Sequence, residues 1–229
     1  MKIKVIGSGS SGNCYRVDDG KTALLIECGL PIKKIKAGCD FDLSSISGCL
    51  ITHEHGDHAR AVSDVMAAGV DVYTTSGTAC ALGITSAYRL SYVSPMVSFN
   101  TGSFRVVPFE IHHDAAAPVG YFIESQHTKE RLLFMTDSYY TEYKFQGLTH
   151  IMVEANYSED SLASAENDMR RFRLKRSHMS IENCIEMLKA NDLSHVKEIW
   201  LIHLSESNGS TKEFKRRVQE ATGCEVYVA

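Results

Sequence analysis

One hexapeptide, residues 53–58 (HEHGDH), constrains this chain more than any other segment. It follows the short apolar run 48–52 and brings three imidazoles and two carboxylates together. Imidazole nitrogen and carboxylate oxygen are the usual ligands of catalytic zinc, and the central glycine lets the backbone turn tightly enough for both halves to face a shared centre. A polar loop with chance histidines is the competing interpretation. The spacing predicts two metal ions, one bound by His53 and His55 and the other by Asp57 and His58.

Three later segments that we expect to be strands also end at residues of the metal-binding type. Segment 106–111 runs into His112 and His113, segment 131–136 into Asp137, and segment 198–202 into His203. A short strand that stops at such a residue aims a ligand rigidly into a site. Each residue alone is weak evidence, because a histidine after a strand is more often hydrogen-bonded or exposed and an aspartate more often forms a turn. Together with the hexapeptide they supply one more histidine for each metal and an aspartate to bridge both.

With these motifs the sequence resembles the metallo-β-lactamase fold superfamily over nearly its whole length. The hexapeptide resembles the family's His-x-His-x-Asp-His motif, and Asp137 and His203 resemble its bridging aspartate and its last ligand. The resemblance implies an α/β fold of the αββα four-layer sandwich type, with two mixed sheets between helices. It also favours His113 over His112, because His113 directly precedes the Asp-Ala pair of the family pattern and strand alternation sends the two side chains to opposite faces. The metal ligands implied are His53, His55, Asp57, His58, His113, Asp137 and His203.

Within this superfamily the chain is most similar to the RNase Z and YycJ-type exonuclease branch. Segments 153–156 (VEAN), 177–180 (SHMS) and 202–205 (IHLS) resemble the His-Glu-Ala-Thr, Gly-His-Ser-Thr and His-Phe-Ser elements of RNase Z, and 7–14 (GSGSSGNC) resembles YycJ. The resemblance implies that His178, oriented by Glu154, donates a proton to the leaving oxygen, and that Asp57 also serves catalysis. An ordinary histidine at a helix N-terminus, beside a capping Ser180, is the competing interpretation of His178.

Glu27 departs from the family pattern, which usually has an aspartate at this place in 24–29 (LLIECG). In the family this residue supports the metal-binding loop. The longer acid is therefore expected to shift the loop without removing a ligand.

Length and composition favour one cytoplasmic domain over residues 1–229. A chain of 229 residues can bury roughly 70% of its unfolded surface without disulfides. No apolar run reaches the ~20 residues that a membrane span needs, and the opening residues 1–7 fit a strand better than a signal peptide, so we expect no membrane partner. The seven cysteines include no Cys-x-x-Cys pair, and several lie in apolar runs. This pattern predicts reduced thiols rather than a disulfide framework or a zinc ribbon.

Alternating and short apolar segments predict a strand-rich chain interrupted by helices. The Gly-rich segment 7–12 favours a tight hairpin over a phosphate loop, because it lacks a Gly-Lys-Ser/Thr ending and no helical pattern follows it. Helices are expected at 59–68, 179–189 and 210–220, the second with an apolar stripe of Ile181, Cys184, Ile185 and Leu188. Strands are expected at 2–6, 14–17, 22–27, 70–75, 88–93, 104–111, 120–124, 131–135, 151–155, up to 203, and 225–228.

The charge distribution favours a phosphate substrate. The net charge of −4 argues against a general coating of nucleic acid. A cationic run just before His178 nevertheless predicts a positive funnel with one aromatic ring, Phe172, for stacking. A solvated loop is the competing interpretation. The expected substrate-binding residues are Arg170, Arg171, Arg173, Lys175 and Arg176.

The ligand set predicts a hydrolase with two divalent metal ions, zinc first and manganese as the alternative. Two adjacent ions lower the pKa of a shared water toward ~7 and stabilise the oxyanion that forms on attack. The proton donor and the basic run favour a phosphodiesterase or nuclease acting on DNA or RNA ends. Hydrolysis of a small phosphodiester such as a cyclic nucleotide stays open as the second interpretation. A thioester hydrolase and a catalytically silent binding module are less favoured, and the sequence is compatible with an oligomer.

Overall fold

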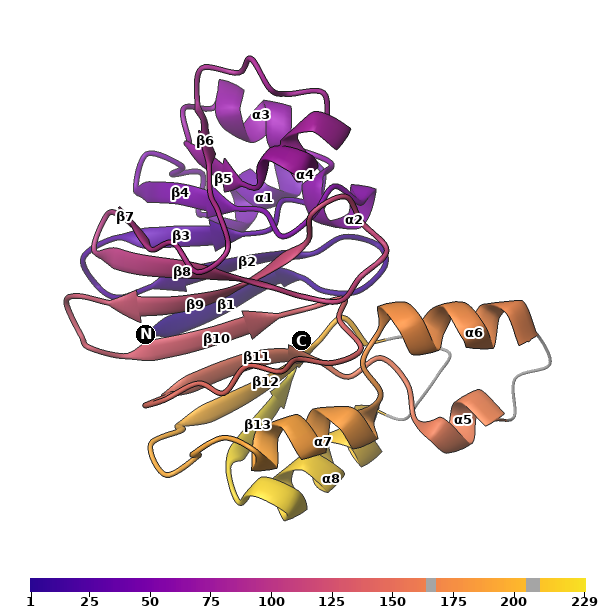
Figure 1. The fold of residues 1–229 in the computed structure, drawn as a ribbon. Helices are drawn as coiled ribbons and strands as arrows, with labels where there is room; N and C mark the ends of the chain where they lie inside the picture. The colour runs from indigo at the N-terminus through magenta and orange to yellow at the C-terminus, as the bar shows by residue number, and fades with distance from the viewer. Residues whose placement is uncertain (164–167, 205–210) are drawn as a thin grey trace. The chain divides into compact units, whose positions relative to one another are not determined.

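The computed structural model describes residues 1–163, 168–204 and 211–229 (Figure 1). The chain divides into two compact units. Unit 1 comprises Met1–Glu110 and Ala115–Lys129, and unit 2 comprises Ile111–Asp114 and Glu130–Ala229. The single domain over 1–229 stays a prediction, because one domain can contain two such units.

Unit 1 contains a six-stranded mixed sheet in the order β1-β2-β3-β4-β5-β6. The first three strands pair antiparallel, and β3 to β6 pair in parallel. The Gly-rich segment between β1 and β2 joins an antiparallel pair, which confirms the predicted hairpin. The strands span Lys2–Gly7 (β1), Cys14–Asp18 (β2), Ala23–Ile26 (β3), Ile46–Leu50 (β4), Val72–Thr74 (β5) and Leu90–Tyr92 (β6).

Four helices of unit 1 are α1 (Ile32–Gly38), α2 (Gly56–Ala59), α3 (Val62–Ala67) and α4 (Ser76–Ala81). Ile35, Val65 and Ala79 bring α1, α3 and α4 into one buried cluster with the sheet residues Leu25 and Cys49. The single helix expected at 59–68 was wrong, because the backbone N–H of Ala61 bonds the carbonyl oxygen of Cys28 and α3 starts anew after it. This break sets α2, which carries part of the hexapeptide, apart from the longer helix.

Three antiparallel strands complete unit 1: β7 (Phe99–Thr101), β8 (Phe104–Glu110) and β9 (Val119–Ser125). They are tied to the six-stranded sheet by side-chain hydrogen bonds to its backbone. The Tyr121 hydroxyl donates to the carbonyl oxygen of Ile51 at 2.7 Å, and the Thr101 hydroxyl donates to that of Ser47 at 2.8 Å. Ile51 lies just before the hexapeptide, so these strands help to fix its position.

Unit 2 contains four strands that pair in parallel in the order β10-β11-β12-β13. They span Arg131–Met135, His150–Glu154, Glu198–Ile202 and Glu225–Val228, and β11 is buried along its whole length, as expected of a parallel strand covered on both faces. The helices are α5 (Glu159–Ala163), α6 (Asp168–Ser177), α7 (Ile181–Lys189) and α8 (Thr211–Thr222). Helices α7 and α8 pack against each other beside β13 (Figure 1).

The predicted helix at 179–189 begins at Ile181, because Ser180 caps it. The Ser180 hydroxyl accepts a hydrogen bond from the backbone N–H of Asn183 at 3.1 Å. Of the expected apolar stripe Ile181, Cys184 and Leu188 are buried, and Ile185 is partly exposed. The capping residue therefore fixes where the segment after His178 turns into a helix.

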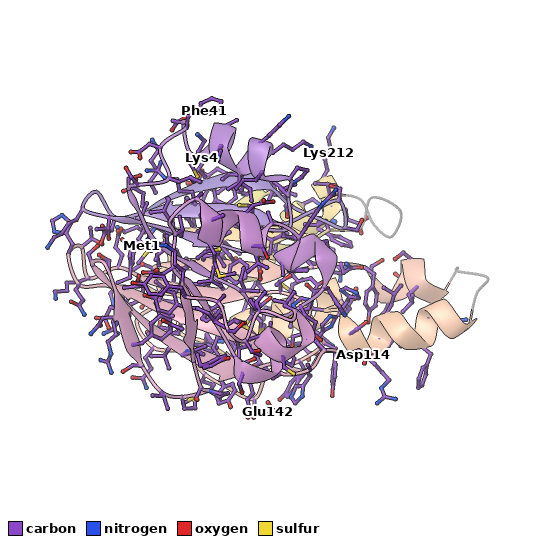
Figure 2. All side chains as sticks on the ribbon, turned by 90° about the horizontal axis from the view of Figure 1, so that it is seen from above. Met1, Lys4, Phe41, Asp114, Glu142 and Lys212 are labelled. Carbon is purple, nitrogen blue, oxygen red and sulfur yellow. The ribbon has the colours of Figure 1, made fainter. Side chains whose placement is uncertain are left out.

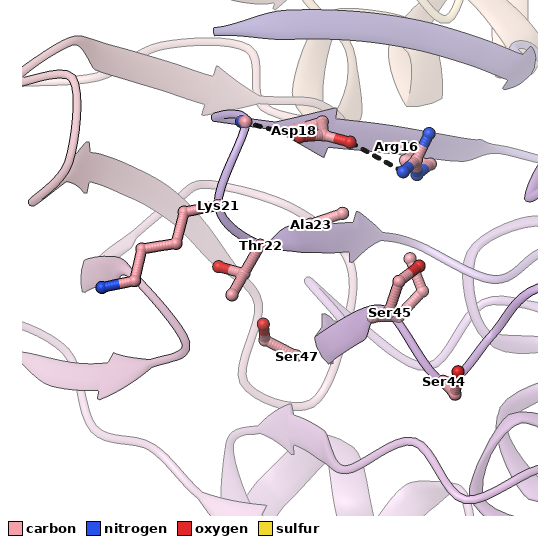
Figure 3. Close-up of a pocket in the computed structure, with 10 residues that line it drawn as sticks. Arg16, Asp18, Lys21, Thr22, Ala23, Ser44, Ser45 and Ser47 are labelled. Atoms are coloured by element: carbon pink, nitrogen blue, oxygen red, sulfur yellow. Dashed lines mark hydrogen bonds and ion pairs between the residues drawn. The ribbon is translucent and has the colours of Figure 1, made fainter.

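Unit 1 also has exposed side chains and a cavity that involve none of the predicted site residues. Lys4 and Phe41 are labelled in Figure 2; Lys4 donates to Asp40, and the Phe41 side chain is 79% exposed. A cavity of about 350 Å³ lies at the turn between β2 and β3, where Arg16 bonds Asp18 at 2.7 Å (Figure 3). None of the predicted site residues lines this cavity.

All seven cysteines are free thiols, and Cys14, Cys28, Cys39, Cys49 and Cys184 are buried. The buried thiols behave as small apolar side chains, and burial raises the pKa of the Cys14 thiol. Among the helices of the described residues, none has the length and apolar character required to cross a bilayer.

A buried carboxylate, Asp19, joins three turns of unit 1. Its Oδ2 accepts hydrogen bonds from Ser103 Oγ at 2.7 Å and Ser125 Oγ at 2.6 Å, and its Oδ1 accepts from the backbone N–H groups of Lys21 and Thr22. Burial alone would raise the pKa of Asp19, but these hydrogen bonds outweigh it and lower the pKa to about 2. The charged form is thus the one that the fold stabilises.

We expect Asp19→Asn to destabilise the protein at pH 7 by about 1–3 kcal/mol. Ser125 Oγ already accepts bonds from two backbone N–H groups, so an amide N–H at residue 19 finds no acceptor there. Since the folded pKa lies below its ordinary value of 3.8, the contribution of Asp19 is present above about pH 4 and is lost as the pH falls toward 2. Denaturant unfolding between pH 2 and 7 should show a smaller acid-dependent loss in the variant. Asp64→Asn, at an exposed position on α3, is the control; equal pH profiles for Asp19→Asn and the wild type would contradict the expectation.

Candidate metal and catalytic site

The hexapeptide in unit 1 links the end of β4 to the short helix α2. His53 and His58 are buried, Asp57 is partly buried and His55 is exposed. His53 Nε2 lies 3.1 Å from His55 Nδ1, and His58 Nε2 lies 3.3 Å from Asp57 Oδ2. Two donors bound about 2.0–2.1 Å from one tetrahedral ion lie roughly 3.3 Å apart. Both predicted pairs therefore have donor atoms at separations that suit a shared cation, and their assignment as ligands stays a prediction.

Gly29, and not the glycine of the hexapeptide, is the residue whose missing side chain lets two backbone segments approach closely. The expected turn at Gly56 is present, because the backbone N–H of His58 bonds the carbonyl oxygen of His55 at 2.9 Å. Gly56 has open space where a Cβ would lie and is not among the residues with positive φ, so this turn does not require a glycine. A Cβ at Gly29 would overlap the backbone carbonyl group of Asp57. The loop is further held by backbone hydrogen bonds from Asn13 N to Asp57 O at 2.7 Å and from Cys28 N to His58 O at 2.8 Å. Close backbone packing thus positions Asp57 and His58.

Glu27 supports the hexapeptide through a buried hydrogen-bond relay. The Thr52 hydroxyl donates to Glu27 Oε1, so it accepts from His53 Nδ1–H at 2.8 Å, and His53 Nε2 lies on the side of His55. The same carboxylate oxygen lies 3.5 Å from His58 Nδ1. Burial raises the pKa of Glu27, while His58 and Thr52 oppose that rise. The Glu27 carboxylate therefore orients two imidazoles.

Asn13 is a supporting residue that the sequence did not reveal as part of the site. Its Oδ1 accepts from Gly9 N at 2.8 Å and from the Tyr15 hydroxyl at 3.1 Å, which fixes the amide plane. Its Nδ2 then lies 3.2 Å from both Asp57 O and His58 Nε2. The only sequence signal was its place at the end of the Gly-rich hairpin. The hairpin thus borders the predicted ligands within unit 1.

In unit 2, four predicted site residues converge at the ends of parallel strands and at the end of α6. Asp137, Glu154, His178 and His203 each offer one ligand atom, and these atoms all lie within 4.8 Å of one another. His178 Nδ1 lies 2.7 Å from Glu154 Oε1 and 3.1 Å from Asp137 Oδ1. His203 Nδ1 lies 3.2 Å from the same Glu154 oxygen, and the His178 and His203 rings stack with centroids 5.6 Å apart. Glu154 therefore orients two histidines instead of the one expected.

The charges in this cluster favour a protonated His178. Burial alone would lower the pKa of His178, but the Glu154 and Asp137 carboxylates outweigh it and raise the pKa to about 10. Burial alone would raise the pKa of Glu154, and its contact with His178 is the main effect that lowers it. Because Nδ1–H bonds carboxylates, Nε2–H is the proton that His178 can present to another molecule.

Asn156 completes the surroundings of Glu154. Its Nδ2 donates to Glu154 Oε1 at 3.1 Å and to the backbone carbonyl oxygen of His203 at 3.1 Å. The resemblance of segment 153–156 to an RNase Z element includes this residue but assigns it no role. Asn156 links β11 to the residue that follows β12.

The two adjacent histidines after β8 take different partners within unit 2. His113 Nδ1–H donates to the carbonyl oxygen of Ser177 at 3.0 Å, and its ring lies 5.8 Å from that of His178. His112 Nε2 instead lies 2.8 Å from Glu142 Oε1, and its ring lies 5.3 Å from that of Tyr139. The separation of the two side chains supports the choice of His113, which stays a prediction.

Three acidic or imidazole residues have left-handed backbone where a strand ends. Glu27 follows β3 with φ of 64°, Asp137 follows β10 with φ of 51°, and His203 follows β12 with φ of 52°. Residues other than glycine adopt this conformation at an energetic cost, which recurs at functional sites. A single sequence gives no signal of it. The bend turns each side chain away from the course of its strand.

The cationic run forms most of helix α6, so the competing interpretation as a loop is wrong. Lys175 Nζ lies 2.9 Å from Glu159 Oε2, and the Arg176 guanidinium lies 5.3 Å from the centre of the exposed Phe172 ring. The Arg171 side chain is partly buried, and the side chains of Arg170 and Arg173 lie outside the described part of the structure, as does Ser205. The role of the run in substrate binding stays a prediction.

Known proteins are similar in sequence to this chain over most of its length. Residues 29–204 match the family described as the Beta-lactamase superfamily domain. The chain belongs to this family. Two curated members are similar over most of their length: exodeoxyribonuclease WalJ of Streptococcus pneumoniae (28% identical, covering 91% of this chain and 83% of WalJ) and exodeoxyribonuclease YycJ of Bacillus anthracis (27%, covering 94% and 86%).

A solved structure shows the same fold. The metallo-β-lactamase fold protein YhfI from Bacillus subtilis superposes with a TM-score of 0.74 at 16% identity, over 99% of this chain and 95% of YhfI. The α/β fold class and the superfamily resemblance are thereby confirmed. The exonuclease names of the two curated relatives agree with the predicted hydrolase class.

We expect Glu154→Gln to lower the pKa of His178 by more than one unit. The substitution removes the negative charge that contributes most to raising this pKa. Histidine ring resonances of the metal-depleted protein, followed by NMR between pH 5 and 11, would measure the shift. Glu182→Gln on α7, where the carboxylate bonds Arg217, is the matched control. An unchanged His178 titration in Glu154→Gln would show that this carboxylate does not control the imidazole.

Proposed function

We propose that this member of the β-lactamase superfamily is a di-metal phosphodiesterase that acts as a nuclease on DNA or RNA ends. The observation that carries the proposal is the contact between His178 and the buried Glu154 carboxylate in unit 2. A histidine held in this way suits proton donation to an alkoxide leaving from phosphorus. The exodeoxyribonuclease names of WalJ and YycJ support a nucleic-acid substrate.

The donor set fits divalent ions of the zinc type, with manganese as the alternative. It combines imidazoles with carboxylates, and Thr52 and Ser177 each bond one ring nitrogen, of His53 and His113 respectively, which orients those rings. When bound, two such ions lower the pKa of water toward neutrality and stabilise negative charge on phosphate oxygens. The residues that would hold them are His53, His55, Asp57, His58, His113, Asp137 and His203, a set that rests on the family pattern and on the donor geometry within each unit.

His178 acts as the proton donor in this proposal, and Glu154 orients it. Glu154 Oε1 accepts a hydrogen bond from His178 Nδ1–H, so Nε2–H is the proton available to the leaving oxygen. With Asp137 engaged as a metal ligand, its charge would be shared with the ion, and the pKa of His178 would lie lower than in the metal-free protein.

Helix α6 is proposed to contact the phosphates of a polymeric substrate. Its cations Arg171, Lys175 and Arg176 lie on the segment that ends directly before His178. The pairing of Lys175 with Glu159 competes with such a contact, although exposed ion pairs are worth little and exchange readily for a phosphate. Hydrolysis of a small phosphodiester is the alternative, and it needs no such helix. The buried free thiols support the cytoplasm as the location.

Asp137→Ala is expected to abolish hydrolysis and to release at least one metal ion, because it removes the carboxylate proposed to bridge both ions. Metal analysis would accompany assays on linear DNA, RNA, a cyclic nucleotide, an aryl phosphodiester and a thioester. Asp71→Ala, which removes an exposed carboxylate paired with Arg89, is the control. Full metal content and activity in Asp137→Ala would exclude the dinuclear site. Wild-type activity on the thioester alone would exclude the phosphodiesterase.

His178→Ala is expected to retain both metals and to lower turnover of nucleic acid by about 10²- to 10⁴-fold, the usual loss for a general acid. A phosphodiester with a good aryl leaving group needs little protonation, so the variant should cleave it almost normally. Steady-state kinetics on both substrates would measure the difference, with His195→Ala at an exposed position as the control. A parallel loss on both substrates, or loss of metal, would make His178 a ligand or a structural residue.

A further inference from the structure

Unit 2 contains a cavity of about 280 Å³ between the segment 140–144 and helix α7. Its lining residues include the aromatic Tyr140 and Tyr143 and the thioether-bearing Met179 and Met187, and Asn183 adds a polar group. Small-molecule sites usually occupy roughly 300–1,000 Å³, so this cavity suits one ring system and not a longer ligand.

Two residues that line the cavity are close in sequence to members of the proposed catalytic cluster. Met179 directly follows His178, and its backbone N–H lies 3.4 Å from Glu154 Oε2. On the other side Tyr140 lies three residues after Asp137. The cavity and the proposed catalytic cluster are therefore connected through two short segments of unit 2, residues 137–140 and 178–179.

Hydrogen bonds hold the tyrosine segment in place. Ser138 Oγ donates to the carbonyl oxygen of Tyr140 at 2.7 Å and accepts from the backbone N–H of His112 at 3.1 Å. Asn183 Nδ2 donates to the carbonyl oxygen of Tyr139 at 3.2 Å, which ties the segment to α7. The Tyr140 side chain nevertheless remains 52% exposed. An exposed ring on an anchored backbone offers a flat surface with little conformational freedom left to lose on binding.

The chemistry of the walls matches a nucleobase better than a phosphate. A nucleobase has a flat face that stacks on aromatic rings and thioethers, and a polar edge that an amide and a carboxylate can bond. Glu142 (labelled in Figure 2) and Glu186 bring two carboxylates to the cavity against the single cation Lys144. That balance disfavours an anion, whereas Glu186 can accept from an exocyclic amino group.

We propose that this cavity is a nucleobase subsite, in which the base of the nucleotide being cleaved stacks on Tyr140 and directs its polar edge to Asn183 and Glu186. The inference rests on the proposed function, which it narrows to substrates that carry a base. It implies that the enzyme distinguishes nucleotides from phosphodiesters without a base through contacts remote from the reacting phosphate.

Two esters with the same leaving group test the subsite: thymidine 5′-(p-nitrophenyl phosphate) and methyl p-nitrophenyl phosphate. The wild type should show a higher kcat/KM for the thymidine ester. Tyr140→Ala should lower the ratio of the two kcat/KM values by about 5- to 150-fold, the usual effect of losing one base–aromatic stack. Tyr140→Phe, which keeps the ring, should restore most of the ratio, and Tyr88→Ala, which removes a ring 97% exposed in unit 1, is the control. An unchanged ratio in Tyr140→Ala would overturn the inference.

A binding measurement separates this inference from the proposed function. With methyl-labelled methionine, thymidine or adenosine should shift the NMR resonances of Met179 and Met187 saturably in the wild type but not in Tyr140→Ala, and should leave exposed Met96 unchanged. The experiment needs neither metal nor turnover. If the wild type cleaves no phosphodiester but these shifts occur, the proposed function fails and the base site stands. If it cleaves phosphodiesters and no shift occurs, the subsite is wrong.

Discussion

A carboxylate that is buried away from water stays ionised only if hydrogen-bond donors or positive charges surround it. Each unit of this protein contains a buried carboxylate beside its histidines. In unit 2, Glu154 takes hydrogen bonds from His178, His203 and Asn156. In unit 1, Glu27 takes one from Thr52 and faces His58. These contacts oppose the cost of burial only while the imidazoles keep their orientation. At Glu154 they outweigh burial and lower the pKa, and at Glu27 they reduce the rise in pKa that burial causes. Fold stability and arrangement of the candidate site are therefore coupled within each unit.

This coupling explains why the departure at Glu27 is compatible with the family pattern. The longer side chain reaches Thr52 and His58 from a residue whose φ of 64° bends the chain at the end of β3. The bend and the extra methylene together set the position of the carboxylate. An aspartate would reach less far from the same backbone, so the residue and its backbone conformation have to be considered as one feature.

The sequence predicted most of the sheet strands and the paired donors of the hexapeptide, because both depend on local pattern: apolar runs, strand ends and closely spaced histidines. It missed α4, since Ser76–Ala81 consists of small residues and has no apolar periodicity. It also missed the contributions of Asn13 and Gly29. Both depend on packing against Asp57, which lies 44 residues away from Asn13 along the chain, and such a contact has no local signature. Membership of the family, rather than any single motif, carries the ligand assignment across both units.

The close backbone packing at Gly29 has a consequence for how the protein is assembled. Main-chain bonds from Asn13 and Cys28 hold the carbonyl groups of Asp57 and His58, and Ala61 bonds Cys28 in return. These bonds involve no side chain that would coordinate an ion. The backbone contacts that shape this loop therefore need no bound cation, in contrast to small metal-binding domains in which the ion itself supplies the folding energy.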